Sequence, residues 1–202
     1  MDVRTAGPWD LTETDGSIDR LDMGSLLITP APGIEIQAQA DQATGTVSQL
    51  TFRNADSMVQ VQPYAAPRSG GFWEEIRGQI SSSINASGGL VEVAEGPFGP
   101  ELRAQVVPSE GGQQLQPARF CGIEGPRWFL RAVFLGAAAR PGDAATILED
   151  MIRGLVVVRG MEAMPVGAPL PLRLPNTGSP EPESAPSPPS PFERGPEITE
   201  IR

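Results

Sequence analysis

The chain of 202 residues contains no histidine and no lysine, so its formal positive charge comes from 15 arginines. Without histidine there is no imidazole general base, no Ser–His or Cys–His pair and no imidazole metal ligand. Without lysine there is neither a Schiff-base amine nor the lysine of a phosphate-binding loop. These absences favour a protein that is not an enzyme, and we expect no metal and no cofactor.

Cysteine and long apolar runs are also scarce. The single cysteine, Cys121, cannot form an intramolecular disulfide or a thiolate zinc site, which favours a reducing compartment. No run approaches the roughly 18 apolar residues that a membrane-spanning helix needs. Residues 1–4 lack the basic and apolar regions of a signal peptide. We therefore expect a cytoplasmic protein with no membrane contact.

The net charge of −10 is concentrated near the two ends of the chain. Residues 1–24 hold six acidic residues and two arginines, and residues 175–202 hold five and two. The stretch between them is nearly balanced, so no basic field attracts nucleic acid, and we expect no nucleic-acid partner. Composition divides the chain into an acidic N-terminal arm (1–24), a folded domain (25–175) and a Pro/Ser/Glu-rich tail (176–202) that is predicted to be disordered.

Hydrophobic patterning within the domain predicts two helices and a series of strands. The stripe of Phe72, Trp73, Ile76, Ile80 and Ile84 predicts a helix over 71–85, and a similar stripe (Ala144, Ile147, Leu148, Met151, Ile152) predicts one over 142–153. Strands are predicted at 26–29, 34–40, 46–53, 57–65, 90–94, 101–107, 114–123, 127–135 and 155–158. Short turns between them favour antiparallel pairing, and residues 128–135, apolar on both faces, are predicted to be central. The fold class is therefore α+β, a mostly antiparallel sheet with two main helices packed on it. The arm is expected to be irregular, and residues 165–175 are expected to be extended on the surface.

Five short stretches occur together in a way that is typical of one family. They are Gly7-Pro8-Trp9-Asp10, Arg20-Leu21-Asp22-Met23-Gly24-Ser25-Leu26, Ala65-Ala66-Pro67-Arg68-Ser69-Gly70-Gly71, Gly96-Pro97-Phe98-Gly99 and Gly125-Pro126-Arg127-Trp128-Phe129-Leu130-Arg131. Over roughly residues 7–175 the chain resembles an actinobacterial family of unknown function, domain-of-unknown-function family 3710. That resemblance implies no activity, substrate or site residue. A weaker similarity, in element order only, is to Mog1/PsbP-like proteins, a fold that mostly serves binding and assembly.

Two groups of residues are candidates for binding an anion or a partner. The first is the loop Arg68, Ser69, Gly70 and Gly71 ahead of the first helix, where free backbone N–H groups suit an anion. The alternative there is an ordinary glycine-rich N-cap, with Ser69 as the expected capping residue, because Glu74 and Glu75 already interact favourably with the helix dipole.

The second group is a set of four arginines on neighbouring predicted strands: Arg103, Arg119, Arg127 and Arg131. If the strand register aligns them, they form a basic ridge that could hold a carboxylate, a phosphate or an acidic segment. The alternative is ion pairing along a wet sheet face with Glu92, Glu101 or Glu124.

Three further features have a structural interpretation. Cys121 is expected to be a small buried residue rather than a reactive thiol. Phe72, Trp73 and Ile76 are expected to pack in the core rather than to line a ligand groove. The pairs Glu74/Glu75 and Glu149/Asp150 are expected to lie on solvated helix faces, because adjacent helical residues point apart.

The tail offers a candidate linear motif, an extended proline-rich segment followed by apolar anchors: Pro188, Pro191, Phe192, Ile198 and Ile201. The hypothesis that follows is a non-catalytic protein-binding or assembly module of the bacterial cytoplasm. The alternative is a domain that binds a small molecule or an anion at the arginines or at the helix start. The sequence identifies neither the partner nor the oligomeric state.

Overall fold

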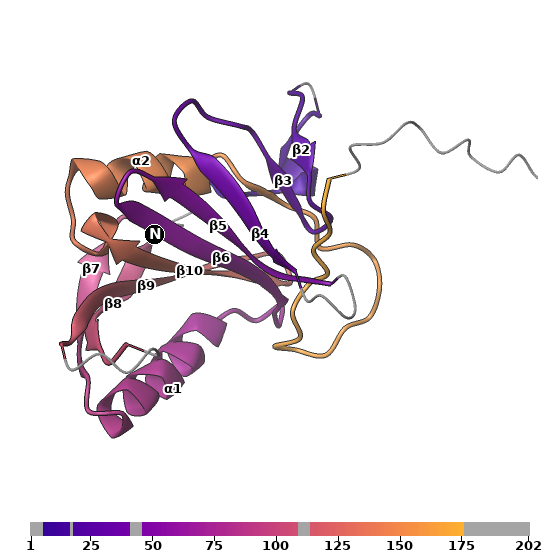
Figure 1. Cartoon of the computed structure of the whole chain (residues 1–202). Helices are drawn as coiled ribbons and strands as arrows, with labels where there is room; N and C mark the ends of the chain where they lie inside the picture. The colour runs from indigo at the N-terminus through magenta and orange to yellow at the C-terminus, as the bar shows by residue number, and fades with distance from the viewer. Residues whose placement is uncertain (1–5, 17, 41–45, 109–113, 176–202) are drawn as a thin grey trace, which may run out of the picture.

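In the computed structural model, which describes residues 6–16, 18–40, 46–108 and 114–175, a seven-stranded antiparallel sheet forms the centre of the molecule (Figure 1). Its strand order is β4-β5-β6-β10-β9-β8-β7. The strands are β4 (Glu35–Ala40), β5 (Val47–Asn54), β6 (Ser57–Ala65), β7 (Leu90–Gly96), β8 (Gly99–Val106), β9 (Gln116–Gly125) and β10 (Trp128–Gly136). The α+β prediction and the central position of β10 are confirmed. Tight turns at Ala55 and Arg127, both with positive φ, reverse the chain between paired strands.

A second, small sheet has the order β1-β11-β3-β2. It is built from β1 (Trp9–Asp10), β11 (Val156–Val157), β3 (Leu26–Ile28) and β2 (Leu21–Asp22), with β1 parallel to β11. The expectation of an irregular arm is therefore wrong for these residues, which also include the 3₁₀ turn η1 (Leu11–Glu13). These residues form strands because they pair with a segment far along the chain: the Trp9 N–H donates to the carbonyl of Leu155.

The two helices cover opposite faces of the large sheet (Figure 1). Helix α2 (Asp143–Arg153), which follows the short turn η2 (Ala137–Ala139), packs on the same face as the small sheet. Inward side chains such as Phe52, Val61 and Leu130 bury the main core there. Helix α1 (Phe72–Ala86) covers the other face, over a smaller cluster of Phe72, Trp73 and Phe129.

Two predictions about burial need correction. On α2 the predicted stripe is displaced, because Ile147 is exposed whereas Glu149 is buried against an arginine. Residues 165–175 are not simply a surface strand. Leu170 and Leu172 are buried, and Leu172 bridges to Gly24 and Val47.

The proposed tail motif (Pro188, Pro191, Phe192, Ile198, Ile201) lies outside the described residues. Within the described part of the chain, no helix is long and apolar enough to cross a membrane.

Candidate binding cleft

The start of α1 already holds an anion from the chain itself. Its N-cap residue is Gly71, not Ser69, and the N-cap residue makes no side-chain hydrogen bond to the helix. The carboxylate of Glu124, at the end of β9, accepts the backbone N–H groups of Gly71 (2.9 Å) and Trp73 (2.5 Å). The expected cap by Ser69 is therefore wrong, because a carboxylate from a distant strand satisfies the helix start. Arg68, Ser69 and Gly70 lie in the loop before it.

The four arginines do not form one basic ridge. Arg103 and Arg119 are register partners on β8 and β9 and lie on the α2 side of the sheet. Arg131 is opposite Gly122, so its side chain lies on the other face, the one that α1 covers. Arg127 is in the turn before β10 and donates to the carbonyl of Gly160. Strand register decides on which face of the sheet each arginine lies, because a shift of one residue would move every side chain of a strand to the opposite face.

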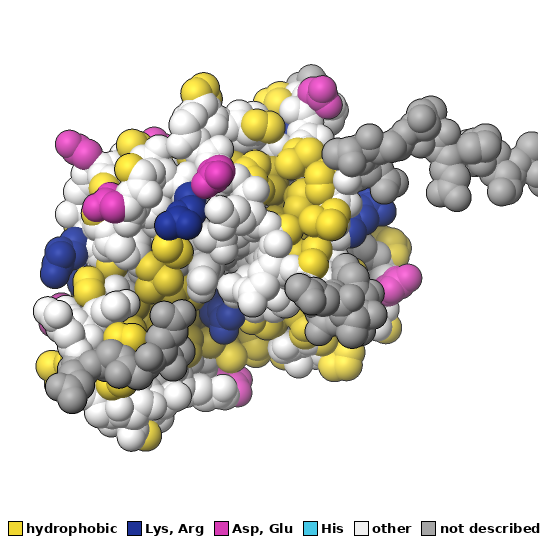
Figure 2. Space-filling view, in the orientation of Figure 1, with side chains coloured by type: hydrophobic (Ala, Val, Ile, Leu, Met, Phe, Trp, Pro, Cys, Tyr) yellow, Lys and Arg dark blue, Asp and Glu magenta, His cyan; other side chains and the backbone are white. Residues whose placement is uncertain are grey.

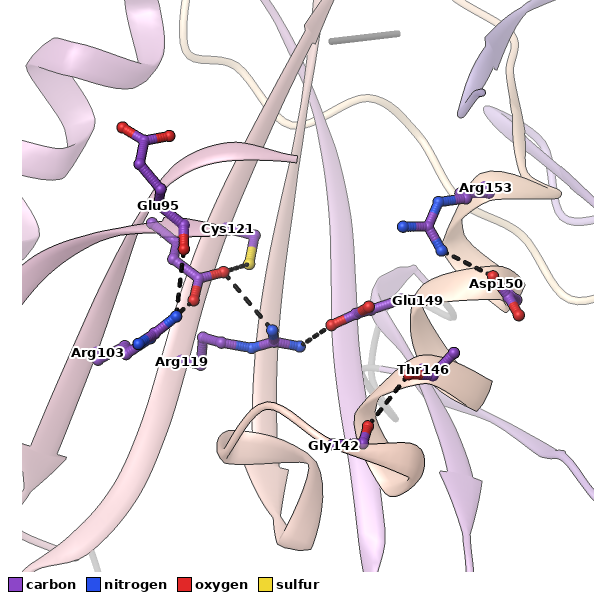
Figure 3. Close-up of polar contacts among 10 residues, drawn as sticks. Glu95, Arg103, Arg119, Cys121, Gly142, Thr146, Glu149, Asp150 and Arg153 are labelled. Carbon is purple, nitrogen blue, oxygen red and sulfur yellow. Dashed lines mark hydrogen bonds and ion pairs between the residues drawn. The ribbon is translucent and has the colours of Figure 1, made fainter. Parts of the chain in front are cut away.

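A buried charge cluster joins β8, β9 and α2 (Figure 3). Arg119, 1% exposed, places Nη2 2.7 Å from Glu149 Oε1 and Nη1 3.6 Å from Glu101 Oε2. Arg103 Nε pairs with the second oxygen of Glu101 at 3.0 Å. The ion-pair alternative is thus confirmed for Arg103 and Arg119 through Glu101. The expected wet sheet face is wrong, because Glu101 and Arg119 are each only 1% exposed. The expectation that Glu149 is solvated is wrong, because Arg119 reaches from the sheet to it.

This cluster is a structural connection rather than an accessible site. The Cys121 thiol donates to Glu101 Oε2 at 3.5 Å. Burial raises the pKa of Cys121 well above its ordinary value, and the positive charge of Arg119 acts in the opposite direction. A protonated, buried thiol is a poor nucleophile. The cluster connects α2 to the sheet through the ion pair of Arg119 with Glu149.

An open cleft lies on the other face, beside α1. It has a volume of about 250 Å³ and is lined by Tyr64, Phe72, Ile76, Gln79, Ile80, Phe129, Arg131 and Gly167. It exists because α1 packs over β7, β8 and β9, so that the flank of the helix overhangs β10 and β6. In Figure 2, hydrophobic side chains gather along this boundary between α1 and the sheet, with a basic side chain among them.

The aromatic residues at the start of α1 have two different roles. Trp73 stacks on Phe129 with ring centres 5.8 Å apart, and its Nε1 donates to the Pro100 carbonyl at 2.6 Å. It is therefore a core residue, as expected. Phe72 meets Phe129 edge-on at 5.4 Å and also lines the cleft, where Ile76 is only half-buried. The interpretation of core packing is thus incomplete for Phe72 and Ile76.

Arg131 gives the cleft its chemistry. Its Nη2 donates to Gln62 Oε1 at 3.0 Å, and its guanidinium carbon lies 5.5 Å from the centre of the Tyr64 ring. The Tyr64 hydroxyl donates to the same Gln62 oxygen. Among the residues that the structure describes, no carboxylate lies within ion-pair distance of Arg131. The cleft therefore combines apolar walls with a half-buried cation that no described carboxylate neutralises.

Sequence reasoning identified Arg131 but missed Tyr64, Gln62 and Gly167. Gly167 belongs to the extended segment after β11, and its N–H donates to the carbonyl of Ala65 at the end of β6. No local pattern signals that approach, because its partner strand lies about a hundred residues earlier in the chain.

The match to known families covers most of the chain. The model of the family described as "Protein of unknown function (DUF3710)" matches residues 7–181. The chain belongs to the DUF3710 family. The matched region includes both sheets, both helices and the cleft. No curated protein matches the sequence.

Among solved structures, this DUF3710 chain is similar to cyanobacterial PsbP (CyanoP) from Synechocystis sp. PCC 6803. The similarity covers 71% of this chain and 96% of CyanoP, at 12% sequence identity and a TM-score of 0.41. The resemblance to the DUF3710 family identified from the sequence is thus confirmed.

Proposed function

We propose that this protein is a non-catalytic binding module, and that the cleft beside α1 takes an apolar side chain of a partner protein together with a neighbouring carboxylate. The observation that carries the proposal is that the charged Arg131 side chain is half-buried in an apolar cleft. A half-buried guanidinium that has no counter-ion among the described residues gains most from an incoming carboxylate, which forms charge-assisted hydrogen bonds with it.

The size of the cleft favours a protein segment over a whole small molecule. Ligand pockets commonly measure about 300–1,000 Å³. The volume of about 250 Å³ here is smaller and suits one or two apolar side chains. The small-molecule alternative also loses support at its two expected sites. The arginine ridge is not formed, and the helix start after the loop is filled by Glu124.

We place this role in the bacterial cytoplasm, which remains an expectation from the sequence. The tail motif (Pro188, Pro191, Phe192, Ile198, Ile201) is a second candidate contact with the same partner. It is tested by comparing the full chain with one that ends at Pro175.

The experiment is a selection of random displayed peptides on the immobilised full-length protein. We expect the enriched peptides to share an apolar residue beside Asp or Glu. Arg131→Gln should weaken their binding about 10- to 100-fold, the scale of one charge-assisted hydrogen bond. The matched control is Arg140→Gln, because Arg140 is exposed on the opposite side of the sheet.

Two outcomes would contradict the proposal. One is a set of peptides that bind the Arg131→Gln protein as tightly as the wild type. The other is the absence of any enriched peptide, combined with a small mass retained by the wild-type protein in native mass spectrometry. That second result would favour the small-molecule alternative.

A further inference from the structure

Strand β7 ends the large sheet with an open edge. It pairs with β8 on one side, and no described strand pairs with its other side. In an antiparallel pair, alternate residues direct their N–H and C=O groups away from the partner strand. Near the hairpin, the Glu95 carbonyl accepts a bond from Arg103 Nη2. The residues before Glu95 therefore offer the open part of the edge, and the second lone pair of the Glu95 carbonyl can still accept a bond from an added strand.

Apart from its two glutamates, this edge lacks the features that usually protect one. Its seven residues contain no proline and no basic residue, and their register with β8 is continuous. The opposite edge strand, β4, has a register shift between Gln39 and Ala40. Exposed apolar side chains also lie along β7, where Leu90 is 64% and Val93 is 61% exposed. A long, regular and apolar edge strand is a template for the addition of another strand.

We propose that β7 pairs with β7 of a second copy of this chain, antiparallel, with Val93 on the two-fold axis. In this register Val93 faces Val93 of the other copy, Glu92 faces Ala94, and Val91 faces Glu95. No glutamate is directly opposite another glutamate, so the strand is complementary to itself. The large sheets of the two copies would then form one continuous sheet, with the α1-side clefts left outside the pairing strands.

The length of β7 and the net charge of the whole chain determine how strongly two copies are expected to associate. A seven-residue strand extends only about 23 Å, which makes a small interface. The net charge of −10 on each copy opposes association. We therefore expect a weak dimer that strengthens as salt screens this repulsion.

Analytical ultracentrifugation of the full chain gives the first test. The average mass should rise towards twice the monomer mass over about 10–500 μM protein, the range of a small interface, and should rise further with added salt. Val93→Lys should remove this rise, whereas Val166→Lys should not. Val166 is a matched control because it is 58% exposed but lies far along the chain, after β11. A wild-type protein that stays monomeric at the highest concentration overturns the proposal.

Disulfide trapping tests the register even if the lysine variant folds poorly. Val93→Cys should form a disulfide dimer in a glutathione redox buffer, because side chains directly opposite in an antiparallel pair are about 5 Å apart. Val91→Cys and Val166→Cys should remain largely monomeric. The native Cys121 is buried and does not compete. Equal trapping of all three variants overturns the register, and no enrichment of the Val93→Cys dimer overturns the pairing. Neither result bears on peptide binding at Arg131.

Discussion

At the residue scale, the positive charge of Arg131 lies beside Tyr64, the one tyrosine of the chain, and affects its pKa. Burial raises the pKa of Tyr64 above its ordinary value of 10.0, and the nearby Arg131 guanidinium partly opposes the rise. We expect the phenolate absorbance of the folded protein to appear at a higher pH than that of the urea-unfolded protein. Arg131→Gln should move it higher still, because the opposing positive charge is removed.

The same shift has a consequence for stability. Because the folded-state pKa is raised, the stabilising effect of Tyr64 is fully present below pH 10.0 and is lost as the pH rises through the folded-state pKa. A carboxylate bound at Arg131 should also raise the tyrosine pKa. A phenolate transition that is identical in the wild type and the Arg131→Gln protein would contradict the contact between the two side chains.

Arg119 is the residue whose removal should cost most. Arg119→Met leaves the buried carboxylates of Glu101 and Glu149 without their shared cation, and we expect the free energy of unfolding to fall by about 3–5 kcal/mol. The matched change Arg153→Met removes a more exposed pair with Asp150 and should cost under about 1 kcal/mol. Urea unfolding of both variants measures the difference. Similar midpoints would mean that the buried cluster contributes little.

At the element scale, the attachment of α1 depends on a glycine beneath it. A Cβ at Gly122 would lie 2.3 Å from Trp73 Cδ2 and 2.6 Å from Phe129 Cε2. Gly122→Ala should therefore displace the stacked rings and lower the free energy of unfolding by about 1–3 kcal/mol, the usual cost of overpacking. The measurement is urea unfolding, followed by tryptophan fluorescence.

A second glycine provides the control for this change. Gly78 lies within α1, and a methyl group added there would meet nothing within 4 Å beyond the backbone of its own helix. Gly78→Ala should raise stability by about 0.5–1 kcal/mol, because alanine loses less backbone freedom in a helix. If both alanine variants had the same sign, tight packing under Trp73 would not explain the effect of Gly122→Ala.

At the scale of the whole molecule, the N-terminal arm connects the small sheet to the large one. Trp128 Nε1, from β10, donates to the carboxylate of Asp10 in β1 at 2.8 Å. Met23, near the end of the arm, is buried in the main core. Removal of residues 1–24 should lower the melting temperature by at least several degrees, since it removes β1, β2 and this hydrogen bond.

Calorimetry of two shortened chains tests this role of the arm. A chain that ends at Pro175 keeps every described element and should melt as the full chain does. A chain that starts at Ser25 should melt at a lower temperature. An unchanged melting temperature for the second chain would support a domain boundary at residue 24, as composition alone predicted.

The sequence by itself determined the type and order of the main elements, because periodicity and turn residues act over a few neighbours. The alternation in 57–65 and the stripe from Phe72 to Ile84 are local patterns, and the corresponding strand and helix form where they were predicted. Tertiary structure decided which groups meet. Glu124 caps α1 and Glu149 pairs with Arg119 across long sequence separations. The face on which each arginine lies follows from strand register, and a shift of one residue inverts that choice without changing the local pattern. The candidate cleft depends on that register, because it places Arg131 under the flank of α1 and away from the acidic side chains that neutralise Arg119.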